Sequence, residues 1–500
     1  MKLRALIIFS FLIIYKLSQA QTDKAKPQKL IGKAESAMGE GWKSVKTLSL
    51  EGYGYENMID ESERPEGPFI PVRISRSILK DLSKQYFKVN EATTTYIFDQ
   101  KRTLLYNDDV AALKIASRVM PAFQSDELGM DLNLAPEIVL KTASAAPDLK
   151  FVKDTSFQKA NHSILFFTYH GYPVRVFLNN ETDLLTAVEI TWPDHDNFGR
   201  IWGDTKRTVI YSFWMLLGKG IHYPMQQDAY VNGWYKSSFL FNKWEVNPEV
   251  IADSLLITDA VKDQCRGLIQ RQDEQLAKGL AKGEQVMPGV WLLPGPCNST
   301  IVDQPDDLVV VEGPYSSAYG EAIINKAQEL FPGKKIKALI TTSDAWLHIG
   351  GVRSFAAIPD IRIYFPARNQ FILKKLLNAH YITEPDAFAK RKKPSYLLTG
   401  ISDTMAVGSG NNRLVIYAYR TETGDRQMMV YFPHYKTVYT SDHYQPKGTD
   451  GKFWNEEIVY EVYHSIKQRG LDVKQFYAMH SQGLIPFEDM VNDAAKMDKL

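Results

Sequence analysis

The segment from Thr341 to Gly351 gathers side chains that could do chemistry. It follows an apolar stretch, Ile336 to Ile340, that predicts a strand, and it contains a hydroxyl at Ser343, a carboxylate at Asp344 and an imidazole at His348. A metal-activated water needs several imidazoles and carboxylates converging on one point, and a serine nucleophile needs a base within reach. The segment supplies a single histidine, so either chemistry would depend on residues elsewhere in the chain.

The spacing between His348 and the pair Gly350-Gly351 carries a resemblance to the metallo-β-lactamase superfamily. Members of that superfamily show the pattern His-x-His-x-Asp-His-x-Gly-Gly in a loop after a strand. When the two glycines of the pattern are aligned with Gly350 and Gly351, only the last histidine of the pattern has a counterpart, His348. The three earlier ligand positions fall on Ser343, Ala345 and Leu347.

The same resemblance locates the other metal ligands of the superfamily. The third ligand of the first metal normally stands ten residues before the Pro of a later strand, read here as Met428 to Pro433, and Thr423 occupies that position. The resemblance therefore implies that the first metal site is lost. For the second metal it leaves His348, the bridging Asp of the glyoxalase-like branch at Asp442, and a C-terminal histidine at His480.

These three residues allow two interpretations. Two imidazoles and one carboxylate could hold a single zinc or similar ion with an open position, and Asp442 would then serve catalysis. Alternatively, Asp442 is a turn carboxylate, and His348 and His480 are remnants of a lost site that holds no cofactor. Leu347 favours the second interpretation, because an apolar side chain removes both a bond and the charge that neutralises the metal.

Residues 286–500 are expected to form one αββα sandwich of the metallo-β-lactamase type. The opening strands are read in Gly289 to Gly295 and Asn298 to Val302, and the strand Leu308 to Val311 precedes a helix at Ala318 to Leu330. Alternating strands and helices favour a layered architecture with the site at strand ends. Together with a β-rich N-terminal domain, this makes the protein α+β.

Residues 21–255 read as β-rich, with a helix at Leu30 to Met38, another around Pro136 to Ser144, and two strands joined by a polar turn at 174–192. This layout resembles the half-barrel of LolA-type periplasmic lipoprotein carriers, which implies a concave apolar face for a lipid-like ligand. A β-rich packing domain without a ligand is the alternative. Residues 256–285 are expected to be a linker helix, because apolar residues recur there at helical spacing.

Residues 1–20 read as a signal peptide, with a basic start, an apolar run and Ser18-Gln19-Ala20. The protein is therefore expected to be exported, periplasmic or secreted, without a transmembrane segment in the mature chain. The 500 residues carry a net charge of +1, so nothing in the composition points to nucleic acid or an anionic membrane as partner. Cys265 and Cys297 could form a disulfide or remain two buried thiols.

Three functions remain open from the sequence. The first is a hydrolase-family protein with a reduced metal centre that binds a small or lipid-like ligand without dinuclear zinc catalysis. The second is a mono-metal hydrolase of an ester, thioester or lactam, built on His348, Asp442 and His480. The third is an envelope scaffold or carrier whose N-terminal sheet binds an apolar chain.

Overall fold

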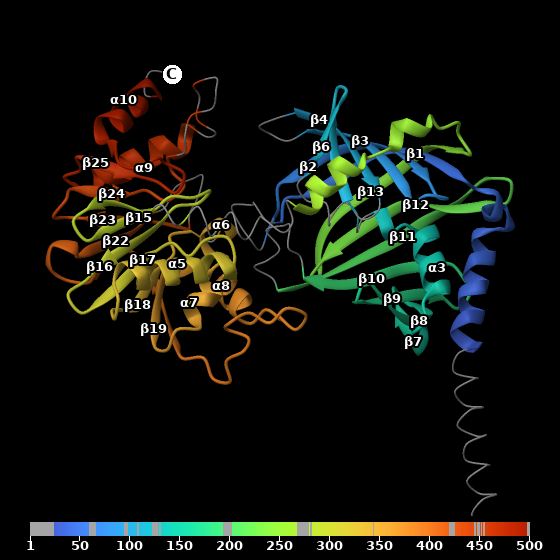
Figure 1. Ribbon diagram of the computed structural model, residues 1–500, viewed down its shortest axis with the longest axis horizontal. Coiled ribbons are helices and arrows are strands. Elements are labelled where there is room, and N and C mark those ends of the chain that lie inside the picture. Colours follow the sequence, from blue (N-terminus) through green and yellow to red (C-terminus); the bar gives the residue numbers. More distant parts are fainter. Residues whose placement is uncertain are drawn as a thin grey trace, which may run out of the picture. The chain divides into compact units, whose positions relative to one another are not determined.

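The computed structural model describes most of the 500 residues (Figure 1). The described residues are 25–59, 67–94, 99–107, 110–122, 129, 132–193, 203–267, 280, 283–343, 345–419, 426–444, 447, 451, 453 and 456–497. The expected signal peptide and Thr423 lie outside them. Within the described residues, no helix combines the length and the apolar character that crossing a membrane requires.

The chain divides into two compact units. Unit 1 comprises residues 1–58, 70–197 and 205–267, and unit 2 comprises residues 59–69, 198–204 and 268–500. Unit 2 thus contains two short segments from the N-terminal half, which the expected boundary at 286 does not include. Of the expected linker helix, the described part is helical at residues 259–267.

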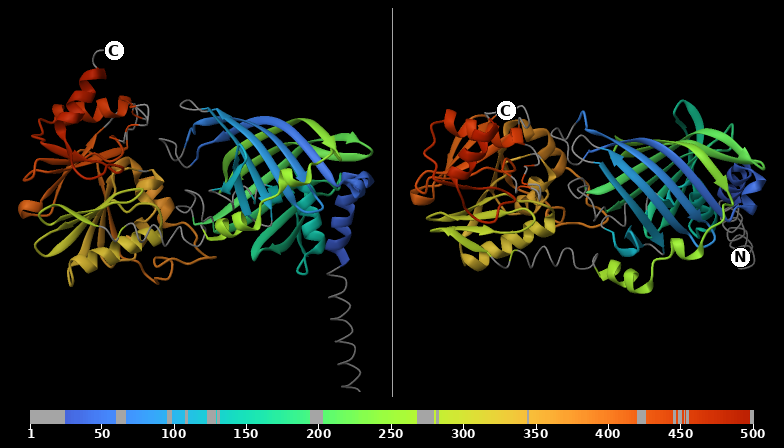
Figure 2. Two further views of the ribbon diagram at one scale, coloured as in Figure 1. Left: turned by 45° about the horizontal axis from the view of Figure 1, so that its top comes forward. Right: turned by 90° about the horizontal axis from the view of Figure 1, so that it is seen from above.

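Unit 1 is built on one antiparallel sheet of thirteen strands, in the order β6-β5-β4-β3-β2-β1-β13-β12-β11-β10-β9-β8-β7. Figure 2 shows this sheet curving. The strands are β1 (Thr47–Asn57), β2 (Pro71–Asp81), β3 (Tyr86–Thr94), β4 (Asp99–Asn107), β5 (Val110–Ile115), β6 (Arg118–Pro121), β7 (Lys150–Phe157), β8 (Ala160–Tyr169), β9 (Tyr172–Asn179), β10 (Leu185–Pro193), β11 (Asp204–Gly218), β12 (Ile221–Val231) and β13 (Trp234–Val246).

The strand order explains what fills the hollow of the sheet. The chain reaches one edge with β6 and resumes at the opposite edge with β7, so the connection between them must cross the sheet. That connection carries α3 (Pro136–Ala145), and the helix at residues 25–38 packs in the same cluster as α3 and the strands β8 to β11. Residues 132–143 contribute to the buried clusters of both halves of the sheet. They therefore lie on its concave side.

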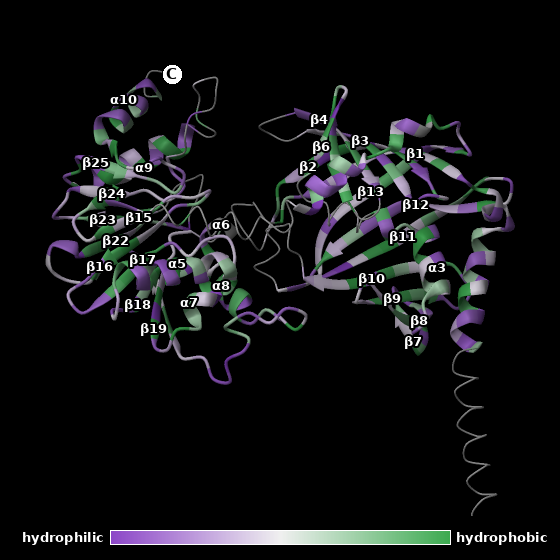
Figure 3. Ribbon diagram, viewed as in Figure 1, coloured by the Kyte–Doolittle hydropathy of each residue, from purple (hydrophilic) through white to green (hydrophobic). Residues whose placement is uncertain are grey.

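Buried and less buried residues alternate along strands such as β1 and β2, and Figure 3 colours the ribbon by the hydropathy of each residue. In β1, Leu48 and Leu50 are buried while Tyr53 and Tyr55 are exposed. Short 3-10 helices, η1 (Glu40–Ser44) and η3 (Ala252–Leu255), complete unit 1. The predicted helix around 136–144 and the hairpin at 174–192 are confirmed by α3, β9 and β10.

Unit 2 contains two sheets. The first has the order β14-β15-β16-β17-β18-β19-β20, in which β17 to β20 are parallel neighbours, and the second runs in sequence order from β21 to β26. The strands are β14 (Glu284–Met287), β15 (Val290–Leu293), β16 (Ser299–Asp303), β17 (Asp307–Val311), β18 (Lys335–Ile340), β19 (Ile361–Pro366), β20 (Tyr396–Ile401), β21 (Thr404–Val407), β22 (Leu414–Tyr419), β23 (Gln427–Phe432), β24 (Thr437–Tyr439), β25 (Gln475–Tyr477) and β26 (Ile485–Pro486).

The two sheets pack face to face, because one buried cluster joins Val309 and Ile340 of the first sheet to Ile416 and Val430 of the second. Helices cover the outer faces, so the arrangement is αββα. They are α5 (Ser317–Leu330), α6 (Trp346–Ile349), α7 (Val352–Ala356), η5 (Ala367–Asn369), α8 (Gln370–Leu377), η6 (Gly410–Asn412), α9 (Glu456–Gln468) and α10 (Phe487–Met497). The predicted α+β class is confirmed.

Candidate functional site

The candidate site of unit 2 lies where five strand ends meet. Loops follow β17, β18, β24 and β25, and a fifth precedes β16. Backbone hydrogen bonds join them: Thr440 N–H donates to Tyr477 O, Met479 N–H to Ser441 O, and Asn298 N–H to Met479 O. The parallel pairings of β17 with β18 and of β24 with β25 place their carboxyl ends at one edge. This edge is where layered α/β folds bind ligands.

The Gly350-Gly351 pair positions the loop that bears His348. A Cβ at Gly350 would lie 2.0 Å from the carbonyl oxygen of Tyr315, and a Cβ at Gly351 would lie 2.9 Å from that of Pro314. Gly351 N–H donates to Gly313 O at 2.8 Å. Only glycine permits this approach of two backbones, so the motif's glycines set the geometry of the loop.

The structure brings His348, Asp442 and His480 into contact. Nε2 of His348 lies 3.0 Å from Oδ2 of Asp442, and Nε2 of His480 lies 3.1 Å from Oδ1 of the same carboxylate. His348 is fully buried, whereas the side chains of Asp442 and His480 are 18% and 24% exposed. One carboxylate thus holds both imidazoles, each through a different oxygen.

Glu312 completes this group, which we call the His–carboxylate network: Glu312, His348, Asp442 and His480. Glu312 is fully buried at the end of β17, and its Oε2 lies 3.1 Å from Nδ1 of His348 in an ion-pair contact that is not a well-directed hydrogen bond. Its Oε1 accepts hydrogen bonds from Thr342 N–H, the Thr342 hydroxyl and Tyr439 Oη. Sequence reasoning missed Glu312; the available signal was a carboxylate directly after four apolar strand residues.

Electrostatics shift the pKa values of His348, Asp442 and His480 towards the charged forms. Burial disfavours an imidazolium at His348, but the carboxylates of Glu312 and Asp442 outweigh it and raise the pKa of His348 to about 10. Burial also opposes the charge of Asp442, yet the two histidines hold the pKa of that carboxyl far below its usual range. For His480, burial is outweighed by the hydrogen bond and charge of Asp442, which raise its pKa.

These contacts do not fit a metal. Nδ1 of His480 donates to Pro296 O at 2.7 Å, and the other three ring nitrogens of His348 and His480 lie 3.0 to 3.1 Å from carboxylate oxygens. A metal ligand must instead present an unprotonated nitrogen. Among the residues that the structure describes, no three His, Cys, Asp or Glu side chains are grouped as a metal ion would require.

Two of the positions expected to correspond to metal ligands, Ser343 and Ala345, lie within the described residues. Ser343 is buried, and its hydroxyl accepts a hydrogen bond from Ala345 N–H at 3.2 Å within the loop. Ala345 has no ligand atom. The side chain of Leu347 lies outside the described residues, as do Asp344 and Thr423. The roles predicted for these positions stay predictions.

A second set of polar residues connects the network to a cavity. The Ser441 hydroxyl contacts Thr342 Oγ1 at 2.7 Å and Gln427 Oε1 at 3.4 Å, and His443 Nδ1 contacts the Tyr419 hydroxyl. Burial lowers the pKa of His443 to about 4, which keeps this imidazole neutral. Tyr419 and Gln427 also line a cavity of about 620 Å³ at the same edge of the sandwich.

We call this the edge cavity. Its volume lies within the range of small-molecule sites. Arg469 donates to Ala418 O at 2.6 Å and pairs with Asp403 at 3.1 Å. The lining is mainly polar: Pro366, Ala367, Arg368, Ile401, Ser402, Asp403, Ala418, Tyr419, Gln427, Ser465, Gln468 and Arg469.

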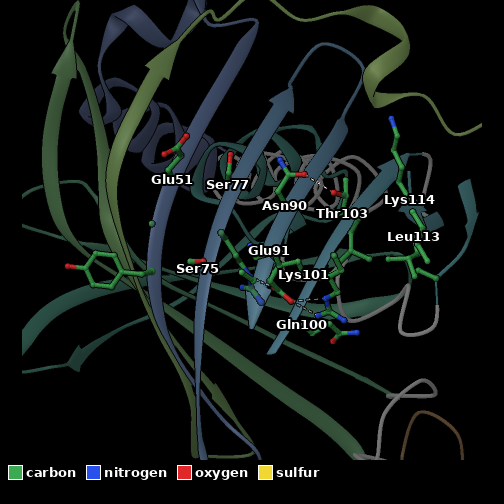
Figure 4. Close-up of a pocket in the computed structure, with 18 of the residues that line it drawn as sticks. Glu51, Ser75, Ser77, Asn90, Glu91, Gln100, Lys101, Thr103, Leu113 and Lys114 are labelled. Carbon is green, nitrogen blue, oxygen red and sulfur yellow. Dashed lines mark hydrogen bonds and ion pairs between the residues drawn. The ribbon is translucent and has the colours of Figure 1, made fainter. Parts of the chain in front are cut away.

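Two cavities of unit 1 bear on the expected carrier role. One, of about 1050 Å³, lies on the face of the sheet opposite Leu50, Ile74 and Val89, and Figure 4 shows its polar floor of Ser77, Asn90 and Thr103. The other, of about 530 Å³, lies between the helix at 25–38, η1 and α3, with apolar lining that includes Met38, Trp42, Val45, Leu82, Ile138 and Leu140. The chain's own helices thus occupy much of the concave face expected to be open.

Both cysteines are free and buried, Cys265 in unit 1 and Cys297 in unit 2. Cys265 packs against Leu105, Ala112 and Ile257. Burial, together with the negative charges of Asp442 and Glu312, raises the pKa of the Cys297 thiol well above its usual value. The alternative of two buried thiols therefore describes the structure.

The sequence matches no protein family model and no curated protein. Among solved structures, similar chains include the mono-zinc form of the metallo-β-lactamase FIM-1 from Pseudomonas aeruginosa, at 17% identity over 44% of this chain and 95% of that one, with a TM-score of 0.32. The metallo-β-lactamase DIM-1 shares 11% identity over 44% and 97%, with a TM-score of 0.33. The inverting sec-alkylsulfatase Pisa1 from Pseudomonas sp. shares 15% over 43% and 40%, with a TM-score of 0.31. Such identities say nothing about the activity of this chain.

Proposed function

We propose that the protein is an exported ligand-binding protein whose unit 2 keeps a hydrolase-like frame but not dinuclear zinc catalysis. The observation that carries the proposal is the shared carboxylate of Asp442, which holds His348 and His480 through their Nε2 atoms. Positive charge that a metal would supply at such a centre comes instead from the protonated ring of His348. Every ring nitrogen of the two histidines lies within 3.1 Å of an oxygen atom, although Glu312 Oε2, His348 Nδ1 and Asp442 Oδ1 form no well-directed hydrogen bond.

The edge cavity is the ligand site in this proposal. A molecule bound there would contact Gln427 and Tyr419, whose side chains contact Ser441 and His443 behind them. The lining contains Arg368 and Arg469 against a single carboxylate, Asp403, so we infer a small polar ligand with an anionic group. The two guanidinium groups could bind a carboxylate, phosphate or sulfate.

Metal content tests the first part of the proposal. Protein purified without added metal and then dialysed should contain far less than one zinc per chain by elemental analysis. Excess zinc should leave the melting temperature unchanged, because an ion that does not bind the folded state cannot stabilise it. Stoichiometric zinc, lost in His480→Ala together with a hydrolytic activity, would overturn the proposal.

One observation favours the mono-metal hydrolase as the alternative. Asp442 and His480 are partly exposed, so an ion could reach them. In that case Asp442→Asn should weaken zinc binding, and Leu347→Asp should strengthen it by adding a carboxylate at a position where the superfamily has one. Unchanged zinc content in both variants would exclude this alternative.

A ligand screen tests the second part. Thermal shift with small carboxylates, phosphates and sulfates should identify a class that stabilises unit 2. Arg368→Ala should abolish the shift, and Arg362→Ala, on the neighbouring strand β19 but outside the cavity lining, is the matched control. A shift retained in Arg368→Ala would place the ligand elsewhere.

Unit 1 offers a separate site for the lipid-like ligand. The cavity of about 530 Å³ combines six apolar side chains with three lysines (Lys43, Lys46, Lys141) and three glutamates (Glu35, Glu40, Glu137). An amphiphile with a polar head group suits this lining. Binding of a fluorescent fatty acid that is lost in Leu140→Arg would support a carrier role, and absence of binding would leave unit 1 as a packing domain.

The proposal that the protein is exported depends on residues 1–20, which we expect to be a signal peptide. Intact-mass analysis of protein recovered from the periplasm or the medium should give a chain that begins near Gln21. A mass that retains Met1 would contradict this part of the proposal.

A further inference from the structure

The hairpin of β11 and β12 ends in an exposed apolar tip. Phe213, Met215 and Leu216 are 67%, 42% and 58% exposed, and the turn Gly218-Lys219-Gly220 follows them. Beside the turn, Trp244 is 37% exposed and its Nε1 donates to Leu217 O at 3.3 Å. We define the hairpin tip as Phe213, Met215, Leu216, Lys219 and Trp244. Single exposed apolar residues are common, but a group of large ones marks an interaction site.

Phe213 is held outward by a strained backbone. Its φ is +57°, a region that bulky residues rarely adopt. The ladder with β12 pairs Ser212 with Gln226 and Trp214 with Pro224, and the two strand neighbours of Phe213, Ser212 and Trp214, are only partly buried. Glycine would satisfy this conformation without strain and without exposing a ring. Strain that presents an aromatic side chain to solvent indicates a selected function.

Basic side chains surround the hairpin tip. Lys219 lies in the turn itself and has no ion-pair partner among the described residues. Lys43 of η1, whose backbone segment contacts the turn at Gly41, has a side chain 81% exposed and pairs with Glu40. Lys243, next to Trp244, is 72% exposed and pairs with Glu51. The nearby carboxylates also include Glu245 on β13. The three lysines and the three glutamates named here are equal in number, and Lys219 is the charged residue that lies in the turn itself.

The shape of the hairpin tip favours a lipid surface over a protein as its binding partner. The apolar side chains stand around the end of a hairpin and line none of the three cavities found in unit 1. A protein partner would need a matching groove, whereas a fluid lipid surface adapts to a protruding tip. Apolar and tryptophan side chains beside lysines suit the boundary between acyl chains and anionic head groups.

We propose that the hairpin tip docks unit 1 on an anionic lipid bilayer. Phe213, Met215 and Leu216 enter the head-group boundary, Trp244 lies at the level of the head groups, and Lys219 contacts their phosphates. The proposal does not depend on the ligand or metal content of unit 2. The protein would reach its membrane as a peripheral protein, since β11, β12 and β13 belong to the sheet of unit 1.

Vesicle co-sedimentation of the full-length mature protein tests the proposal. It should bind vesicles containing phosphatidylglycerol at least tenfold more tightly than pure phosphatidylcholine vesicles, and Trp fluorescence should shift to the blue. The double variant Phe213→Ser with Leu216→Ser should lose at least tenfold in binding. Lys219→Glu should reduce binding to the anionic vesicles only. Phe371→Ser, which removes a 60% exposed ring from unit 2, should change nothing.

Phe213→Gly separates a functional role from a structural one. It relieves the backbone strain, so unit 1 should become more heat-stable while vesicle binding falls several-fold. Three outcomes would overturn the proposal: no binding to either vesicle, binding unaffected by all tip variants, or a dimer that the tip variants dissociate. The last would identify the tip as an interface between two copies of this chain.

Discussion

At the scale of single residues, Glu312 determines how the network is held. It is fully buried, accepts three hydrogen bonds through Oε1 and faces the charged ring of His348 with Oε2. The motif around His348 could be recognised from the sequence because it is local. The role of Glu312 could not, because it depends on a contact between β17 and a loop thirty residues later.

Replacing Glu312 should be costly. Glu312→Gln leaves the imidazolium of His348 with one carboxylate fewer in a buried site, and breaking such a pair costs about 3–5 kcal/mol. Urea unfolding of unit 2 should show this loss. Glu329→Gln is the control, since its partner Lys326 forms an i,i+3 pair with a carboxylate 68% exposed, and exposed pairs contribute about 0–1 kcal/mol. Equal effects of the two variants would mean that the network does not stabilise the fold.

The network also predicts a pH dependence of stability. The pKa of His348 is raised from its usual value of about 6.5 to about 10, so its contribution is fully present below about pH 6.5 and is lost as the pH rises toward 10. The pKa of Asp442 is lowered, so its contribution is present above about pH 4 and is lost as the pH falls. Unit 2 should be most stable between these values.

Thermal unfolding at a series of pH values measures this window. The melting temperature of unit 2 should decline between about pH 7 and 10. Asp442→Asn should flatten the decline, because the amide no longer favours the charged form of His348. A decline of the same slope in the variant would show that other groups cause it.

At the scale of elements, sequence periodicity predicted the individual strands and helices well, because alternation and helical spacing are local. The hairpin β9–β10 and helix α3 are examples. These local patterns could not predict where α3 packs against the sheet. It follows from the order of thirteen strands, in which β6 and β7 lie at opposite edges. The sequence led us to expect an open apolar hollow, but α3 packs inside it.

A buried ion pair fixes α3 in the hollow. Lys80 of β2 contacts Glu137 at 2.7 Å, with side chains 3% and 7% exposed. Glu137→Ala should destabilise unit 1 by about 3–5 kcal/mol, because it leaves the charge of Lys80 buried alone. The double variant Lys80→Met with Glu137→Leu should recover most of that loss. Chemical denaturation of the wild type, Glu137→Ala and the double variant measures the free energy of unfolding of unit 1. A double variant that is no more stable than Glu137→Ala would contradict the argument.

At the scale of the whole molecule, composition averages conceal local features. A net charge of +1 gave no reason to expect an anionic surface as partner, yet Lys219 and the apolar residues of the hairpin tip lie together. The division into domains likewise depends on contacts that the order of residues along the sequence does not show. A boundary drawn along the sequence cannot place Gly203 and Asp204 in unit 2, because their partners lie near residue 380.

Asp204 gives this division a testable consequence. Its carboxylate accepts hydrogen bonds from the N–H groups of Ile382 and Thr383 at 2.9 and 3.2 Å, and its own N–H donates to His380 O. Asp204→Ala should therefore lower the stability of unit 2, by about 1 kcal/mol, although the residue precedes most of that unit by more than sixty positions. Hydrogen exchange should show lost protection at Ile382 and Thr383.

A matched variant tests whether this effect is specific to unit 2. Asp148 accepts hydrogen bonds from the backbone N–H and the hydroxyl of Thr168, both within unit 1. Asp148→Ala removes bonds of the same kind, so it should lower the stability of unit 1 and leave exchange near Ile382 unchanged. Each unit has its own buried clusters, and two cores with separate unfolding transitions should register the two variants separately. If Asp204→Ala instead weakened only unit 1, residues 198–204 would belong to the N-terminal fold, and the boundary drawn along the sequence would be the correct one.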